Sequence, residues 1–176
     1  MEFDVSIRRA RPADLVAMAC LIATFRNSLA RLRPDDREIE RDLARLLRDS
    51  AVTVGLATTG TGAVGYALQR RHYSLWAQGE AALLEDLFVV EAVRGRGVGR
   101  RLVEHAIQEA RAAGCCAMSL DTNERNVASN ALYRNLGFAS ERKRWDGGRQ
   151  IRHDLLLEPA PQFDGRIRWG PWMVRW

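Results

Sequence analysis

Hydrophobic and polar positions along the chain follow two periods, and these periods predict the order of helices and strands. In four segments apolar residues recur every three or four positions, which is typical of helices. Other short runs alternate or stay apolar throughout and are bounded by turn residues, which is typical of strands. The predicted helices cover residues 12–28, 35–48, 98–113 and 126–136, and the predicted strands cover residues 5–8, 51–57, 63–69, 82–90, 115–120, 138–145 and 150–157.

The order of these elements, β-α-α-β-β-β-α-β-α-β-β, predicts the fold class. Glycine-containing turns at residues 58–62 and 146–148 predict hairpins, so the strands that flank them should be antiparallel. The helix at residues 98–113 connects two strands as a crossover, which makes those two strands parallel. We therefore expect an α/β fold of mixed (α+β) type, in which helices cover both faces of a central mixed, mostly antiparallel sheet.

Composition shifts only near the end of the chain, after the proline-containing residues 158–161. The tail that follows holds Trp169, Trp172 and Trp176 together with several arginines. We expect one domain over residues 1–158 and a tail over residues 159–176 that packs on this domain or on the partner of a homodimer.

The overall composition indicates an ordinary soluble protein. Of the 176 residues, 47% are hydrophobic and 28% are charged, which suits one globular domain. No apolar run approaches the roughly 20 residues that span a bilayer, and the N-terminus lacks the pattern of a signal peptide. The net charge is +5, but the basic residues are interspersed with acids and no nucleic-acid-binding signature is present. We therefore expect no membrane and no nucleic-acid partner.

Cysteine and histidine positions bear on compartment and metals. Cys115 and Cys116 are adjacent, which makes a bridge between them unfavourable, and we expect a reducing, cytoplasmic setting with this pair packed in a buried strand. His72, His105 and His153 are scattered without metal-ligand spacing, so we expect no metal site.

The most informative segment joins a predicted strand to the helix at residues 98–113. It has the sequence Arg94-Gly95-Arg96-Gly97-Val98-Gly99 and is followed by Arg100. Glycines let the backbone approach a ligand closely, and the helix that begins here contributes unpaired N–H groups and the positive end of its dipole. Arginine charges complete an anion site suited to a pyrophosphate. The alternative interpretation is a structural turn without a ligand.

The same segment partly matches a dinucleotide-binding G-x-G-x-x-G motif. Gly95 and Gly97 match its first two glycines, but the third position is Arg100, which is too large for the close helix–strand packing that glycine permits there. About 90 residues of other topology also precede the segment. Both observations disfavour a nicotinamide cofactor.

Three motifs together resemble the GCN5-related N-acetyltransferase (GNAT) superfamily. The spacing Arg94-x-x-Gly97-x-Gly99 resembles its acyl-CoA-binding signature. The segment at residues 126–138 is similar to its asparagine-to-tyrosine helix, which ends in Gly-Phe, and residues 84–89 resemble its fourth strand. The resemblance covers roughly residues 3–158 and leaves the tail outside.

This resemblance implies acetyl-CoA as cosubstrate and assigns residues to it. The backbone N–H groups of residues 96–100 would hold the pyrophosphate, with help from the charges of Arg94 and Arg96. Asn126 matches a position that binds the pantetheine arm, and Tyr133 matches the residue that protonates the leaving thiolate. The full set of implied cofactor-binding residues is Phe88, Val89, Val90, Arg94, Gly95, Arg96, Gly97, Val98, Gly99, Arg100, Asn126 and Tyr133. Asn126 and Tyr133 each have an alternative role without a ligand: Asn126 could only cap its helix, and Tyr133 could be an aromatic that only packs its helix against the protein.

Glu85 is the predicted general base. An alkylamine with a pKa near 10.4 is about 0.04% neutral at pH 7, so the reaction needs a group that accepts its proton. Strand alternation places Glu85 on one face with Leu83 and Leu87, and Asp86 on the other face. Either acid could instead be a surface group, and the choice between the two stays open.

The expected activity is direct transfer of an acetyl group from acetyl-CoA to a primary amine of a small molecule. The acids of the second predicted helix, Glu38, Glu40 and Asp42, would help to attract a cationic acceptor. The alternatives are acetylation of a protein N-terminus or lysine, and a regulatory module that binds CoA without turnover.

Overall fold

The computed structural model describes residues 4–139. The chain forms two compact units, one that ends at Asp121 and one that begins at Thr122. Several predicted features lie outside the described residues: the domain boundary at residue 158, the strand at residues 150–157 and the tail. Residues 140–145 of the predicted strand 138–145 also lie outside them. Among the described residues, no helix has the length and apolar character needed to cross a membrane.

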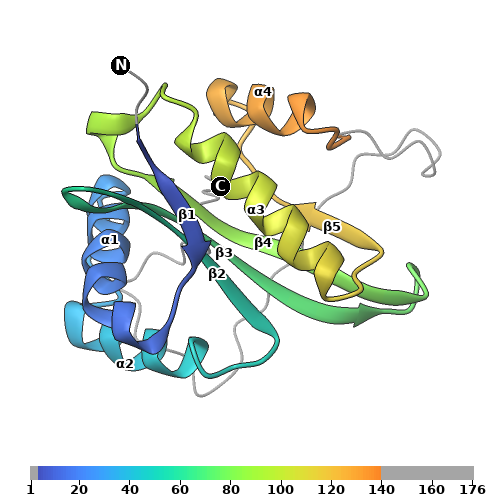
Figure 1. Cartoon of the computed structure of the whole chain (residues 1–176), viewed down its shortest axis with the longest axis horizontal. Coiled ribbons are helices and arrows are strands. Elements are labelled where there is room, and N and C mark those ends of the chain that lie inside the picture. Colours follow the sequence, from blue (N-terminus) through green and yellow to red (C-terminus); the bar gives the residue numbers. More distant parts are fainter. Residues whose placement is uncertain (1–3, 140–176) are drawn as a thin grey trace. The chain divides into compact units, whose positions relative to one another are not determined.

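The first unit is built on a sheet whose strands follow one another in space as they do in sequence. Four of them pair as antiparallel neighbours, and the last runs parallel to the fourth. In the part of the chain that the structure describes, the strands are β1 (Ser6–Arg9), β2 (Val52–Thr59), β3 (Gly62–Ser74), β4 (Gly79–Val89) and β5 (Ala117–Leu120) (Figure 1). The expected mixed, mostly antiparallel sheet is confirmed.

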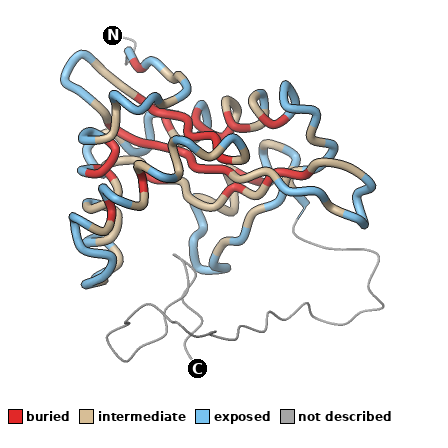
Figure 2. The backbone as a smooth tube through the Cα atoms, turned by 90° about the horizontal axis from the view of Figure 1, so that it is seen from below, coloured by how far each residue is buried: buried red, intermediate tan, exposed pale blue. Residues whose placement is uncertain are grey.

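Helices cover both faces of this sheet, as the sequence predicts. On one face, α1 (Leu15–Ser28) and α2 (Asp36–Leu46) pack on alternate residues of β2 and β3, which include Val54, Leu56 and Tyr66. On the other face lies α3 (Val98–Ala112), whose Leu102 is fully buried. Figure 2 shows the buried positions concentrated in the strands and on the inner sides of the helices, with exposed residues at the turns.

Two expectations about the strands are wrong. Residues 70–81, which lie between the predicted strands 63–69 and 82–90, are not a simple connection but the end of a long hairpin, because backbone pairing extends through Ser74↔Gly79 despite the polar sequence there. Furthermore, β5 is not buried. It begins after Cys115 and Cys116, lies at the edge of the described sheet beside β4, and alternates exposed and half-buried residues. Cys116 is therefore exposed and Cys115 only half-buried.

The described part of the second unit holds α4 (Val127–Asn135), which matches the helix predicted at residues 126–136. Asn126 caps it, since its side-chain oxygen accepts a hydrogen bond from the Ser129 N–H at 3.3 Å. Tyr133 is buried and packs edge-on against Phe138 with ring centroids 5.8 Å apart.

Candidate active site

The connection from β4 to α3 has the conformation that its glycines predict. A 3-10 turn (Glu91–Val93) ends β4, and the chain then passes through Gly95 and Gly97 with φ of +74° and +80°. These left-handed angles favour glycine over any other residue. A Cβ at either position would meet no atom within 4 Å. Glycine is therefore required here by backbone conformation, and the space beside the loop is open.

The N-terminus of α3 differs from those of α2 and α4 in having no side-chain cap. Asp35 caps α2 and Asn126 caps α4, whereas Gly97, the N-cap residue of α3, has no side chain that could do so. The first N–H groups of a helix have no partner within the helix. Those of α3 are therefore able to bind an anion, which is the role predicted for residues 96–100.

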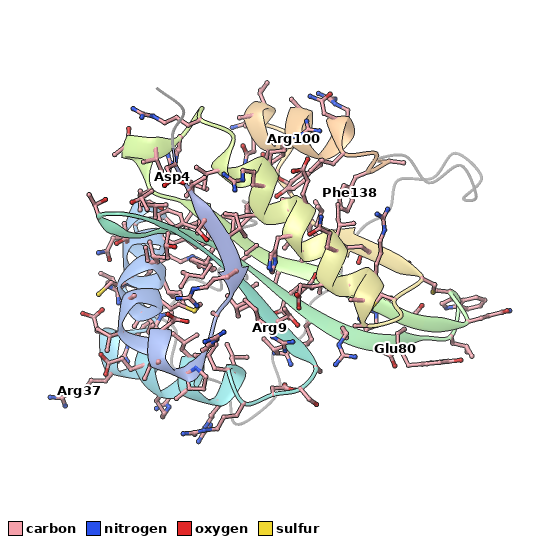
Figure 3. All side chains as sticks on the ribbon, in the orientation of Figure 1. Asp4, Arg9, Arg37, Glu80, Arg100 and Phe138 are labelled. Atoms are coloured by element: carbon pink, nitrogen blue, oxygen red, sulfur yellow. The ribbon has the colours of Figure 1, made fainter. Side chains whose placement is uncertain are left out.

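The arginines around this loop lie in different directions. Arg94 turns back over the end of β4, where its Nε donates to the Val89 carbonyl at 2.9 Å and its guanidinium carbon lies 5.9 Å from the centre of the Phe88 ring. Arg100, labelled in Figure 3, lies on the first turn of α3. It pairs along the helix with Glu104 at 2.8 Å. Arg94 thus fixes the loop to the strand, and Arg100 contributes its charge from the helix surface.

The end of β4 has one edge that β5 does not cover. Parallel pairing with β5 stops at Leu84↔Leu120. Beyond it the Val90 N–H donates to the Val64 carbonyl of β3 at 2.9 Å, so by strand alternation Phe88 and Val90 direct their backbone groups toward β3. Val89, and also Leu87, then direct theirs toward the open edge. Of the three positions that the resemblance assigns to a pantetheine arm, Val89 directs its backbone groups toward the open edge, and Phe88 and Val90 do not. Leu87 also faces this edge, and the sequence does not single it out because pairing direction is not visible there.

A β-bulge in β4 changes the predicted arrangement of the two acids. Leu68 of β3 pairs with Asp86, while the next residue, Gln69, pairs with Leu84, so Glu85 is the extra residue of the bulge. Asp86 lies on the face that α1 and α2 cover, with Leu68. Glu85 reaches Arg70, which is on that same face. The expectation that Glu85 and Asp86 lie on opposite faces is therefore wrong.

Glu85 takes part in an ion-pair network. Its carboxylate lies 3.1 Å from Arg70 Nε, and another nitrogen of Arg70 lies 2.9 Å from Asp49. All three side chains are about one-third exposed. One arginine thus joins the β4 bulge to the turn before β2, and it partly compensates the charge of the predicted base.

Asp86 is in a different electrostatic environment. Burial raises the pKa of its carboxyl group to about 6; the adjacent Glu85 charge adds to the rise, and the charge of Arg31 opposes it. Arg31 belongs to the connection between α1 and α2. A carboxyl group with a pKa near 6 can both accept and release a proton at neutral pH, which is what general-base catalysis needs. Desolvation thus places the pKa of Asp86 in the range that suits a general base.

The acids of α2 are engaged locally. Glu38 accepts from the Asp35 N–H at 2.7 Å and from Arg33 at 2.6 Å, which makes it part of the capping box of its own helix. Asp42 pairs with Arg41 at 2.8 Å. Helix capping and local ion pairs therefore account for the presence of Glu38 and Asp42 in this helix.

Asn126 and Tyr133 belong to the second unit, whereas the loop, the β4 edge and the two acids belong to the first. The capping interpretation of Asn126 is confirmed, and its side-chain NH₂ group is not used by the cap. Burial raises the pKa of Tyr133, so its hydroxyl keeps its proton at neutral pH. Within residues 4–139, no group of three or more His, Cys, Asp or Glu side chains is arranged to hold a metal ion.

Comparison with known proteins identifies the relatives of this chain. Residues 18–138 match the sequence model of the Acetyltransferase (GNAT) family. An aminoglycoside N(6')-acetyltransferase type 1 of Stenotrophomonas maltophilia is 31% identical over 159 residues, which cover 88% of this chain and 95% of that protein. A D-amino-acid N-acetyltransferase of Saccharomyces cerevisiae is 32% identical over 85 residues, which cover 48% of this chain and about half (53%) of that relative.

The fold also has close counterparts among solved structures. An aminoglycoside acetyltransferase from an uncultured soil metagenomic sample superimposes with a TM-score of 0.70 at 19% identity, over 87% of this chain and 95% of that one. At this identity the likeness concerns the fold alone. It agrees with the order of strands and helices described above.

Proposed function

The chain belongs to the GNAT acetyltransferase family, and from this membership we propose that it transfers the acetyl group of acetyl-CoA directly to a primary amine of a small molecule. The observation that carries the proposal is the position of Asp86. Its carboxyl group, with a pKa of about 6, lies three residues before Val89, or about 10 Å along the strand. The same strand thus holds a proton acceptor and an open backbone edge that leads into an anion-binding loop.

The described residues fit acetyl-CoA. The uncapped N-terminus of α3 and the open space at Gly95 and Gly97 suit a pyrophosphate, with the charges of Arg94, Arg96 and Arg100 in support. At the open edge the Val89 N–H suits an amide carbonyl of a pantetheine arm, while the Val89 carbonyl already accepts from Arg94. When bound, acetyl-CoA supplies the activated acetyl group.

Each protein group then has a defined task. Asp86 accepts the proton of the acceptor amine, directly or through one water, which offsets the cost of about 4.6 kcal/mol for a neutral amine at pH 7. Glu85 attracts the cationic amine and raises the basicity of Asp86. With acetyl-CoA bound, the Val89 N–H would donate to the carbonyl of the thioester. The family resemblance assigns to Tyr133 the proton that the departing thiolate would take up. The Asn126 NH₂ group binds the pantetheine arm.

Several finer points belong to the same proposal. The relatives named for aminoglycosides and D-amino acids support a small-molecule acceptor. We propose a cytoplasmic location, because Cys20 and Cys116 are free and exposed thiols, and a homodimer that the tail helps to form.

Release of CoA thiol with a panel of amines tests the activity. The panel contains aminoglycosides, D- and L-amino acids, a polyamine and a lysine-containing peptide, each with acetyl-CoA. Turnover with small amines supports the proposal, whereas turnover with the peptide alone indicates a protein acetyltransferase. Binding of acetyl-CoA by calorimetry without turnover on any amine indicates a regulatory module.

A further inference from the structure

The hydroxyl group of Tyr66 is buried without a hydrogen-bond partner. Tyr66 lies in the middle of β3 and is 0% exposed, and its oxygen accepts from or donates to no protein group among the described residues. Buried polar atoms in folded proteins almost always have a partner, either a protein group or an ordered water. An orphaned hydroxyl in the core therefore points to a partner that protein groups do not supply.

Strand register places Tyr66 on the same face of the sheet as the proposed base. Tyr66 pairs with Phe88, and Leu68 pairs with Asp86, so Tyr66 and Asp86 are diagonal neighbours on the same face of the sheet. Diagonal neighbours in an antiparallel pair are about 7–8 Å apart, which a tyrosine side chain can span. The bulge at Glu85 lies on the other side of Asp86 and leaves this pairing intact.

Two phenylalanines fix the ring of Tyr66 in place. Phe25 of α1 stacks on Phe88 at 5.1 Å and meets the Tyr66 ring edge-on at 6.5 Å, while the Tyr66 and Phe88 rings are 6.2 Å apart. The ring is enclosed by α1 on one side and by β4 on the other. Its hydroxyl therefore cannot rotate into solvent to find a partner there.

The electrostatic environment suits a donor–acceptor pair. The charged groups that face Asp86 are Glu85 on its own strand and Arg31 from the α1–α2 connection, and Arg70 on β3 binds Glu85. Burial and the Asp86 charge raise the pKa of Tyr66 far enough that the phenol stays protonated. An ionised carboxylate can only accept hydrogen bonds, and a protonated phenol can donate one.

We propose that Tyr66 is a positioning residue for Asp86: its hydroxyl, which has no protein partner, is hydrogen-bonded through one ordered water to the ionised Asp86 carboxylate. This hydrogen bond fixes the carboxylate orientation and stabilises its charged form. The inference rests on the proposed function, in which Asp86 is the base. It explains why the core of this sheet holds a tyrosine at a position where phenylalanine would fill the same space.

Tyr66→Phe tests the proposal, with Tyr73→Phe as its matched control. Tyr73 is on the same strand and is 66% exposed, so its hydroxyl is already in water. The Asp86 pKa is measured by carbon-13 NMR of the carboxyl groups, with the resonance assigned by its loss in Asp86→Asn. We expect Tyr66→Phe to raise that pKa by about one pH unit, a tenfold change in proton affinity, because one hydrogen bond to the charged form is lost. Tyr73→Phe should leave it unchanged.

The same variants separate this inference from the proposed function. If the Asp86 pKa and the acid limb of kcat/KM both move to higher pH in Tyr66→Phe, the positioning role of Tyr66 and the role of Asp86 as base are both supported. If the pKa moves but the pH profile of kcat/KM does not, the Tyr66–Asp86 hydrogen bond stands and the role of Asp86 as base is overturned. An unchanged or lowered Asp86 pKa overturns the inference, whatever the activity, and a change in Tm alone assigns the hydroxyl a merely structural role.

A second measurement needs no change at Tyr66. The sequence has three tyrosines, so incorporated 3-fluorotyrosine gives three fluorine resonances, which Tyr73→Phe and Tyr133→Phe assign. The Tyr66 resonance should shift with pH with a midpoint near 6, and this transition should vanish in Asp86→Asn. A Tyr66 resonance that does not respond to pH in the wild-type protein would overturn the inference even if Tyr66→Phe failed to fold.

Discussion

Gly97 and Gly114 stand at opposite ends of α3 with almost the same backbone angle, φ of +80° and +79°, and a Cβ at either would meet no atom within 4 Å. Alanine at either position should therefore cost the same stability, about 1–2 kcal/mol for the left-handed conformation. The two positions differ only in what lies beside them: Gly97 begins the helix at the proposed pyrophosphate site, and Gly114 ends it. We expect Gly97→Ala to weaken acetyl-CoA binding at least tenfold and Gly114→Ala to leave it unchanged. Thermal unfolding first checks that the two variants have the same stability, and calorimetry then measures the affinity of each for acetyl-CoA. Equal affinities would argue against the loop as the binding site.

The pH dependence of catalysis distinguishes the two acids of the β4 bulge. Asp86 must be ionised to accept a proton, so kcat/KM should fall as pH decreases through about 6. Asp86→Asn should lower kcat/KM by about 10²–10⁴. Glu85→Gln should retain more activity and move the acid limb to lower pH, because the Glu85 charge is one of the causes that raise the pKa of Asp86. Stopped assays from pH 5 to pH 9 with one working amine test both variants. Loss of activity in Glu85→Gln together with full activity in Asp86→Asn would make Glu85 the base.

Folding stability should show the cost of desolvating Asp86, which is half-buried. Its pKa is near 6 in the folded protein and about 3.9 in an unfolded chain, so the folded state binds the proton more tightly. The stability that this group contributes is therefore present below pH 4 and is lost as pH rises through 6. The free energy of unfolding should fall by about 3 kcal/mol, since each unit of pKa difference corresponds to ~1.4 kcal/mol. We expect Asp86→Asn to be more stable than the wild-type protein at pH 7.5 and to lack this decline between pH 4 and pH 6.

Asp14 provides the control of opposite sign for that experiment. Its carboxylate binds Arg8 through two contacts of 2.7 Å, which lowers its pKa to about 2. Its contribution to stability is present above pH 4 and is lost as pH falls toward 2. Asp14→Asn should therefore destabilise the protein at pH 7.5, where Asp86→Asn stabilises it. Melting temperatures at pH 4.5 and 7.5 are sufficient, and a lower melting temperature for Asp86→Asn at pH 7.5 would contradict the assigned burial.

The loop and the sheet were predictable because their signals are local. Left-handed angles at Gly95 and Gly97 follow from the residue type, and the crossover at α3 follows from the strand–helix–strand order. The bulge was not predictable, since nothing in the sequence of residues 84–86 marks which residue is left unpaired. A single extra residue reverses the alternation beyond it, and this is why Glu85 and Asp86 were assigned to opposite faces.

Other differences arise from partners that a sequence does not show. Arg70 is one of many arginines in the chain, and only the folded structure reveals that it binds Glu85 and Asp49 together. The polar residues beyond Arg70 read as a loop, yet they remain in β3 because their backbone groups pair with β4. In the sequence Tyr66 is only an aromatic residue of a predicted strand. The structure shows that its hydroxyl has no protein partner, and the strand register shows that it shares a face with Asp86.

Gly65 links the packing of the sheet to the proposed binding edge. A Cβ at this position would lie 2.7 Å from the Phe88 carbonyl oxygen and 3.3 Å from Val89 Cα, so the end of β4 would have to shift. We expect Gly65→Ala to cost about 1–3 kcal/mol in folding stability. It should also raise the Kd for acetyl-CoA, because the shift displaces the Val89 edge. Gly60→Ala, in the β2–β3 turn with no atom within 4 Å of its Cβ, is the control for the substitution itself. Calorimetry well below the melting temperature of each variant separates the local shift from unfolding. An unchanged Kd in a folded Gly65→Ala variant would mean that the backbone at Val89 does not contact the cosubstrate.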